Sequence, residues 1–203
     1  GNVALNLIGT SYTLIHEQKS TQLRDAREFS SLLNACGRMR KPGIALQICL
    51  GERGAILDEV QQLVLEYRQT LAKYVDWLTQ AREKIVELKT VYVVHGEGIV
   101  DDNMTGAISS MVSSAGILGT DKALIVLART SRGKIRVSAR APRVLIEKNV
   151  NLDLALRESA QKASGIGGGH DVAAGAQVPE DKLEGFLRDV DETILNQMSL
   201  SKS

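Results

Sequence analysis

Gly167-Gly168-Gly169-His170-Asp171-Val172-Ala173-Ala174-Gly175-Ala176 is the stretch from which this chain is best understood. Glycines lack a Cβ, so residues 167–169 can adopt positive φ and bring their backbone amides close to an anion. His170 adds a hydrogen-bond donor, and the small residues after it allow close packing. We therefore predict a glycine loop at a phosphate or nucleotide site, with an ordinary turn as the alternative. The spacing matches neither a P-loop nor a dinucleotide-binding fingerprint.

Around this loop the sequence alternates between strands and helices. Periodicity and propensity predict strands at 91–95, 122–128, 134–141 and 174–178. Helices are expected after Asp101 or Asp102 (with apolar Met104, Ile108, Met111 and Val112), from Asn151 or Asp153 through 156–160, and over 180–198. The predicted fold class is α/β, a mixed β-sheet flanked by helices, and its domain covers residues 91–199.

The chain before residue 55 is expected to be mainly helical. Asp25 is predicted to cap a helix, with Glu28 as its capping-box partner and Gly37 as the residue that ends it. The apolar positions of this helix are Phe29, Leu32, Leu33, Cys36 and Met39. Short strands are expected at 3–8 and 12–15, and the apolar run 44–50 fits either a strand or a helix.

An apolar stripe without Pro or Gly runs through residues 55–88. It predicts one long helix, or two nearly collinear ones, of about 50 Å. A helix of this length typically connects two lobes; a coiled-coil dimer seam is the alternative. The expected division is therefore 1–54, a connecting helix over 55–90, and the α/β domain over 91–199.

Composition restricts the classes of function. The chain has 203 residues and a formal net charge of +1, which gives no basic field over the whole protein. Residues 129–148 nevertheless form a basic run, which suits phosphate binding; its members are Arg129, Arg132, Lys134, Arg136, Arg140, Arg143 and Lys148. Aromatic residues make up only 3%, which disfavours base stacking and favours contacts to the nucleic-acid backbone.

Cysteine content and hydropathy bear on the compartment. Cys36 and Cys49 lie in apolar contexts, so we expect reduced core thiols of a cytoplasmic protein. No apolar run approaches the ~20 residues that span a bilayer, and we expect no membrane partner. The sequence reads as starting in mid-chain, without a signal peptide.

The hairpin over 122–141 places charged residues on one side. Because side chains alternate along a strand, Arg136, Ser138 and Arg140 should face away from the apolar residues between them. Arg140 could offer a bidentate fork to a phosphate, or form a surface ion pair. His95 follows a strand, and a satisfied histidine is favoured there over a metal ligand.

Three separated segments resemble RecJ-like phosphoesterases of the DHH family, the archaeal type included, in the expected order. They are Asn34-Ala35-Cys36-Gly37-Arg38, Ser138-Ala139-Arg140 and the stretch 167–175. The string 23–29 before the first segment is similar to the archaeal branch related to Cdc45. The resemblance implies the C-terminal half of such a protein, with a DHH-associated domain. It also implies a helix over 44–50 and a long helix joining two lobes.

The resemblance also implies a binding site. Its substrate-binding residues would be Asn34, Arg38, Arg136, Ser138, Arg140, Gly167, Gly168, Gly169 and His170. Helix capping is an alternative role for Asn34 and Arg38. The family's Asp-His-His motif is absent, and none of the histidines His16, His95 and His170 neighbours another. We therefore expect no catalytic or metal-binding residue in this chain, with His170 contacting a phosphate near the scissile bond.

The function implied is the nucleic-acid-binding half of a single-strand-specific exonuclease acting in DNA repair or replication. Its Mn or Mg ions would belong to a missing catalytic lobe, and the chain alone would be inactive. The expected partners are single-stranded DNA or RNA and replication proteins. The alternative is a non-catalytic module: a Cdc45-like replication scaffold, or an RNA-binding domain such as that appended to alanyl-tRNA synthetases.

Overall fold

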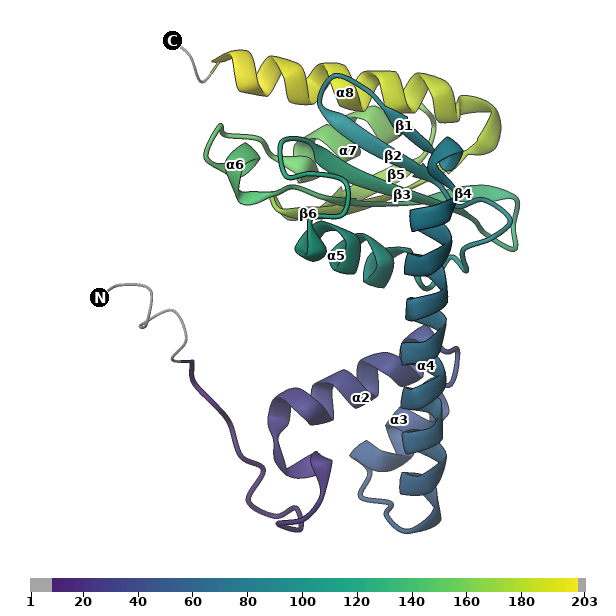
Figure 1. The fold of residues 1–203 in the computed structure, drawn as a ribbon, viewed down its shortest axis with the longest axis vertical. Coiled ribbons are helices and arrows are strands. Elements are labelled where there is room, and N and C mark those ends of the chain that lie inside the picture. Colours follow the sequence, from purple (N-terminus) through teal and green to yellow (C-terminus); the bar gives the residue numbers. More distant parts are fainter. Residues whose placement is uncertain (1–8, 201–203) are drawn as a thin grey trace. The chain divides into compact units, whose positions relative to one another are not determined.

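A computed structural model describes residues 9–200 of the chain, which divides into two compact units, residues 1–70 and 71–203 (Figure 1). The strand predicted at 3–8 lies outside the described residues. The strand predicted at 12–15 is wrong, because only Thr13 forms a β-bridge, to Asp25. Over residues 9–200, no helix combines the length and apolar content that a membrane span requires.

The first unit is helical. Its elements are the 3-10 turn Gln22–Arg24 and the helices α2 (Ala26–Arg38), α3 (Pro42–Cys49) and the first part of α4 (Ala55–Gln80). Asp25 caps α2 as predicted, because its carboxylate accepts hydrogen bonds from the N–H groups of Arg27 (2.8 Å) and Glu28 (3.1 Å). The helix expected over 44–50 is confirmed. The buried apolar core of the unit comprises Leu23, Leu32, Cys36, Ile44, Ile48, Val60 and Leu63.

Two predictions in this unit are wrong. Gly37 lies inside α2, and the residue with positive φ is Arg40 (φ 59°). The Lys41 N–H donates to the Cys36 carbonyl at 2.8 Å and the Arg40 N–H donates to the Gly37 carbonyl at 3.3 Å, which closes the helix in a Schellman motif. Cys49 is exposed at the last residue of α3, whereas Cys36 is a buried core thiol.

The long helix ends earlier than its apolar stripe suggested. α4 stops at Gln80, so it measures about 39 Å at 1.5 Å per residue. A 3-10 turn over Arg82–Lys84 follows, and Ile85–Glu87 forms strand β1, which pairs antiparallel with β2 (Val91–His95). The prediction of helix over 81–88 is therefore wrong, because these residues gain a strand partner that the sequence pattern does not show.

The second unit contains a mixed sheet of strand order β1-β2-β3-β4-β6-β5. Its other strands are β3 (Ala123–Arg129), β4 (Lys134–Arg140), β5 (Ile166–Gly169) and β6 (Ala173–Pro179). β2 and β3 are parallel, and every other neighbouring pair is antiparallel. This sheet with its helices confirms the α/β fold class.

Helices cover both faces of the sheet (Figure 1). α7 (Leu152–Lys162) and α8 (Leu183–Leu200, after the 3-10 turn Glu180–Lys182) lie on one face, and α5 (Thr105–Ala115) lies on the other, while the short α6 (Arg143–Ile146) follows β4. The main core lies under α7 and α8. It includes Ile135, Val137, Ala139, Leu156, Phe186, Val190 and Ile194.

Helix starts in this unit were predicted with mixed success. Asn151 caps α7 as one of the two predicted caps, accepting the Leu154 N–H at 3.1 Å. α5 has Met104 as its N-cap residue with no side-chain cap, so the predicted capping by Asp101 or Asp102 is wrong. Asp101 instead accepts the Asn103 N–H at 2.9 Å, which stabilises the turn before the helix. Met111 is exposed rather than part of the apolar face.

Candidate functional site

The three glycines lie in a strand and not in the predicted loop. Gly167, Gly168 and Gly169 belong to β5, at the edge of the sheet. A Cβ on Gly167 would lie 2.6 Å from the Leu156 carbonyl oxygen and 3.0 Å from the Ala160 Cβ of α7. Gly167 therefore allows close packing of α7 against the edge strand, a requirement that the local sequence does not reveal.

His170 begins the hairpin turn between β5 and β6. Its N–H donates to the Ala173 carbonyl at 2.8 Å, and the Ala173 N–H donates back at 3.3 Å. The histidine is exposed. His170 and Ala173 are thus directly opposite each other, which continues the β5–β6 register by one pair.

The strand register aligns the predicted site residues in rows across β4, β6 and β5. In the first row Arg140 lies opposite Ala173, which lies opposite His170. The next row is Ser138, Gly175 and Gly168, and the third is Arg136, Gln177 and Ile166. At about 4.8 Å between strands, the backbones of Arg140 and His170 are about 10 Å apart.

All three rows belong to the side of the sheet on which α5 lies, called the α5-side face below. Residues directly opposite each other in paired strands share a face, and Ser138 faces α5, with its hydroxyl oxygen 3.0 Å from that of Ser109. α5 packs against β3 and β4, while α7 packs against β5 and β6 from the other side. Ile166, in the edge strand, is 79% exposed.

Ser138 is covered more deeply than its predicted role suggested. It is buried, and its hydroxyl group pairs with Ser109 of α5. Opposite it, Gly175 and Gly168 contribute no side chain. Gly175 and Gly168 therefore form a low floor beside Ser138, which α5 covers.

Arg140 and Arg136 lie at the two ends of this floor. The half-buried Arg140 donates from Nη1 to the Ala139 carbonyl (2.9 Å) and from Nη2 to the Gly106 carbonyl of α5 (3.4 Å). Arg136 is exposed, and its Nε lies 3.7 Å from an oxygen of Asp102. Contacts with backbone carbonyls orient the Arg140 guanidinium, which keeps its positive charge at any physiological pH.

The glycine amides are not equivalent. The Gly169 N–H donates to the Asp153 carboxylate at 2.8 Å, so this amide already has an anionic acceptor within the protein. Asp153 also forms an ion pair with Arg157 at 3.1 Å. The carboxylate shows that the backbone at this edge can hold an oxygen anion.

His95 is a satisfied histidine, as favoured from the sequence. Its Nδ1 lies 3.2 Å from a carboxylate oxygen of Glu97. Burial raises the pKa of Glu97, but hydrogen bonds from His95 and from the Glu97 backbone N–H, together with the electrostatic effects of His95 and Arg129, outweigh it, so the net pKa is lowered. Among residues 9–200, no group of at least three His, Cys, Asp or Glu side chains could hold a metal ion.

Asn34 and Arg38 lie on α2, in the first unit, whereas the other predicted site residues belong to the second unit. Asn34 is exposed and Arg38 is half-buried. Burial raises the pKa of Tyr67, and the positive charge of Arg38 opposes that shift. Their predicted role in binding stays a prediction.

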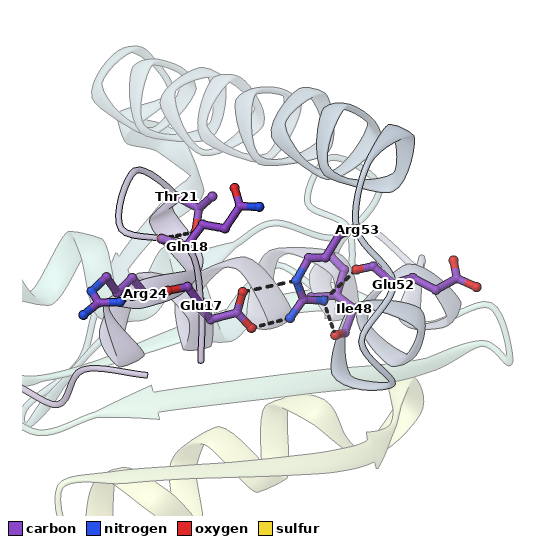
Figure 2. A network of polar contacts seen from close by, with 7 residues as sticks. All are labelled: Glu17, Gln18, Thr21, Arg24, Ile48, Glu52 and Arg53. Atoms are coloured by element: carbon purple, nitrogen blue, oxygen red, sulfur yellow. Dashed lines mark hydrogen bonds and ion pairs between the residues drawn. The ribbon is translucent and has the colours of Figure 1, made fainter. Parts of the chain in front are cut away.

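The first unit also contains an arginine network that the sequence analysis did not single out (Figure 2). Arg53 pairs with the Glu17 carboxylate through Nε (3.2 Å) and Nη2. Its Nη1 donates to the carbonyls of Ile48 (2.8 Å) and Glu52 (2.6 Å), which fastens the end of α3 to the segment before α2. No local motif marks Arg53, because its partners are up to 36 residues away.

Comparison with known proteins places this geometry in context. A model of the DHHA1 domain family matches residues 89–196, which is more than half of the chain. An uncharacterized protein of Methanocaldococcus jannaschii is 34% identical over 194 residues, which cover 95% of this chain and 39% of that protein. The chain thus spans well under half the length of this relative.

Solved structures share the fold. The RecJ protein of Thermus thermophilus in complex with Mn²⁺ superposes with a TM-score of 0.60 at 24% identity, over 84% of this chain and 24% of that one. An exonuclease RecJ bound to manganese gives a TM-score of 0.57 at 22% identity, over 84% of this chain and 40% of that one. At these identities the likeness concerns the fold.

Proposed function

This chain belongs to the DHHA1 domain family, and we propose that it is the substrate-binding half of a single-strand-specific exonuclease of the DHH family. Its second unit would bind backbone phosphates of single-stranded DNA or RNA on the α5-side face. The observation that carries the proposal is the register that sets Arg140, Arg136 and His170 around a floor of small residues.

The chemistry of these groups suits a phosphodiester. The Arg140 guanidinium carries a permanent charge and a planar set of donors, which fits the oxygens of a phosphate. Exposed His170 can donate a hydrogen bond to a neighbouring phosphate oxygen, and the glycine floor leaves room for the chain. Positive groups at the oxygens that do not react would stabilise the charge that develops during hydrolysis.

Hydrolysis itself would require Mn or Mg ions held by residues outside this sequence, since the described residues offer no suitable cluster. The isolated chain would then bind without cleaving. Asn34 and Arg38 would contribute further polar contacts from the first unit. The same proposal extends to DNA repair or replication in the cytoplasm, with replication proteins as additional partners.

Fluorescence anisotropy of labelled single-stranded DNA and RNA, at low and moderate salt, tests the binding proposal. We expect Arg140→Ala to weaken binding by at least ~1 kcal/mol, about fivefold, because a charge-assisted contact is lost. His170→Ala should weaken it as well. Arg188→Ala, on an exposed position of α8, is the charge-matched control and should change little. Unchanged affinity of Arg140→Ala at low salt would refute the assignment.

A further inference from the structure

We propose that Arg132 and Lys134, at the tip of the β3–β4 hairpin, form a second phosphate-binding site that continues the α5-side face. The ligand favoured by this face would then be a strand several nucleotides long and not a mononucleotide or dinucleotide. This inference rests on the proposed function and adds a distinct site to it.

Geometry aligns the tip with the arginines of the site. Side chains two residues apart share a face of a strand, so Lys134 lies on the same face as Arg136 and Arg140. Each such step advances about 6.8 Å, and the distance from Arg140 to Lys134 along β4 is about 20 Å. An extended nucleic-acid backbone would pass beside α5, over Gly175 and Gly168. It would run past Arg140 first, then Arg136, and then Lys134.

The tip is structurally well defined. The Thr130 hydroxyl donates to the Lys134 carbonyl at 3.0 Å and accepts the Lys134 N–H at 3.2 Å. Gly133 has φ 71°, a left-handed conformation that glycine adopts without strain. The turn can therefore present the exposed Arg132 and Lys134 side chains from a closed hairpin.

Charge pairing separates the tip from the rest of the basic run. Arg129 forms an ion pair with Glu180, and Arg143 forms one with Glu147 at 3.0 Å. The side chains of Arg132 and Lys134 have no hydrogen-bond or ion-pair partner among residues 9–200. Two neighbouring cations without carboxylate partners raise the local positive potential, which attracts a polyanion.

The carboxylates near this path are already paired. Asp102 lies beside Arg136 at 3.7 Å, and Glu180 pairs with Arg129. Asp181, after the end of β6, lies 3.9 Å from Lys182. Pro179 and Gln177, which lie opposite Lys134 and Arg136, carry no charge. Arg132 and Lys134 thus add two positive charges at the end of this path, as suits a surface that tracks a nucleic-acid backbone.

The test measures affinity against ligand length with the full chain. Labelled 5′-phosphorylated dinucleotide, hexanucleotide and dodecanucleotide are titrated against the wild type, Arg132→Ala/Lys134→Ala and the control Arg188→Ala/Lys162→Ala. The control removes two cations from the helices on the other face. We expect the tip variant to lose about tenfold in affinity for the dodecanucleotide, with a salt slope smaller by about 1.4, and to bind the dinucleotide within about twofold of the wild type.

Equal losses for all lengths, or no loss for the dodecanucleotide, would overturn the inference. Parallel titration of Arg140→Ala separates the two proposals. If Arg140→Ala lowers the affinity for all three oligonucleotides and the tip variant lowers none of these affinities, only the second site is wrong. If the wild type binds none of the ligands, or Arg140→Ala changes nothing, the proposed function fails and the inference with it. The charge reversal Arg132→Glu/Lys134→Glu should enlarge the length-dependent loss.

Discussion

Arg53 and the hairpin tip show two opposite environments for cationic side chains in one molecule. Arg53 donates to a carboxylate and to two backbone carbonyls, so its hydrogen-bonding capacity is used within the first unit (Figure 2). Arg132 and Lys134, in the second unit, have no side-chain partner among the described residues. Arg140, also in the second unit, has partners that include the backbone carbonyls of Ala139 and Gly106.

The difference has a physical consequence. A guanidinium whose donors all meet protein acceptors stabilises the fold, and removing it leaves its acceptors without partners. A cation without an acceptor contributes little to folding but attracts anions from solution. The sequence shows only an arginine in each case, and the contacts decide between a structural role and a binding role.

The largest expected effect is on folding. Arg53→Ala should lower the free energy of unfolding of the first unit by about 2–3 kcal/mol, because the Glu17 carboxylate and the Ile48 carbonyl lose a charged donor. Urea unfolding measures this change, with the rate of alkylation of the buried Cys36 as the readout. The Cys49→Ser background removes the exposed thiol. Nucleic-acid affinity should not change. If Cys36 is alkylated at the wild-type rate, the structural role of Arg53 is wrong.

The second effect concerns ionic strength. Arg140→Ala should reduce the slope of log affinity against log salt concentration by about 0.7, the value for one phosphate contact to a single strand. Arg53→Ala should leave this slope unchanged, since its charge is already paired within the protein. Anisotropy titrations over a salt series give both slopes. Identical slopes for the wild type and Arg140→Ala would place the phosphates elsewhere.

A third effect extends the comparison to hydroxyl groups. The Ser159 hydroxyl of α7 is buried and has no partner within residues 9–200, whereas the Ser109 hydroxyl pairs with Ser138. Ser159→Ala should therefore raise the free energy of unfolding of the second unit by about 1 kcal/mol, and Ser109→Ala should lower it by about the same amount. Thermal or urea unfolding measures both; a loss of stability in Ser159→Ala would show a hidden partner.

The smallest effect is a pH dependence at the start of α2. Hydrogen bonds from the N–H groups of Glu28 and Arg27 hold the pKa of Asp25 below its usual range. The stabilisation is therefore present above the unfolded-state pKa of about 3.9 and is lost as the pH falls through the folded pKa. In a circular-dichroism titration from neutral to acid pH, Asp25→Asn should lose helicity at a lower pH than the wild type, because the asparagine has no carboxylate to protonate. Identical titrations would argue against the cap.

Local sequence patterns correctly predicted the elements that are stabilised by residues close to them in the chain. Asp25 caps α2 through residues two and three positions away, and β2 matches its predicted bounds of 91–95. The elements that were mispredicted depend on distant partners. Residues 85–87 continue a helical apolar stripe, but pairing with β2 makes them a strand.

The predicted site divides in the same way. The alternation along β4 places Arg136 and Arg140 on one face, and this could be inferred from strand geometry alone. The alignment of Arg140 with His170 across β6 depends on register, which only the pairing of strands distant in sequence provides. The burial of Ser138 under α5 likewise comes from packing.

The sequence by itself determined the α/β class, the helix and strand periods, and the basic run with its glycine and histidine stretch, because these depend on residues close together in the chain. The tertiary structure decided that the glycines form an edge strand under α7 and that Arg53 joins the end of α3 to the segment before α2. It also left the Arg132 and Lys134 side chains without a partner among residues 9–200. The physical reason is that pairing, burial and charge compensation are contacts between residues distant in sequence, and local preference does not encode which of them will meet.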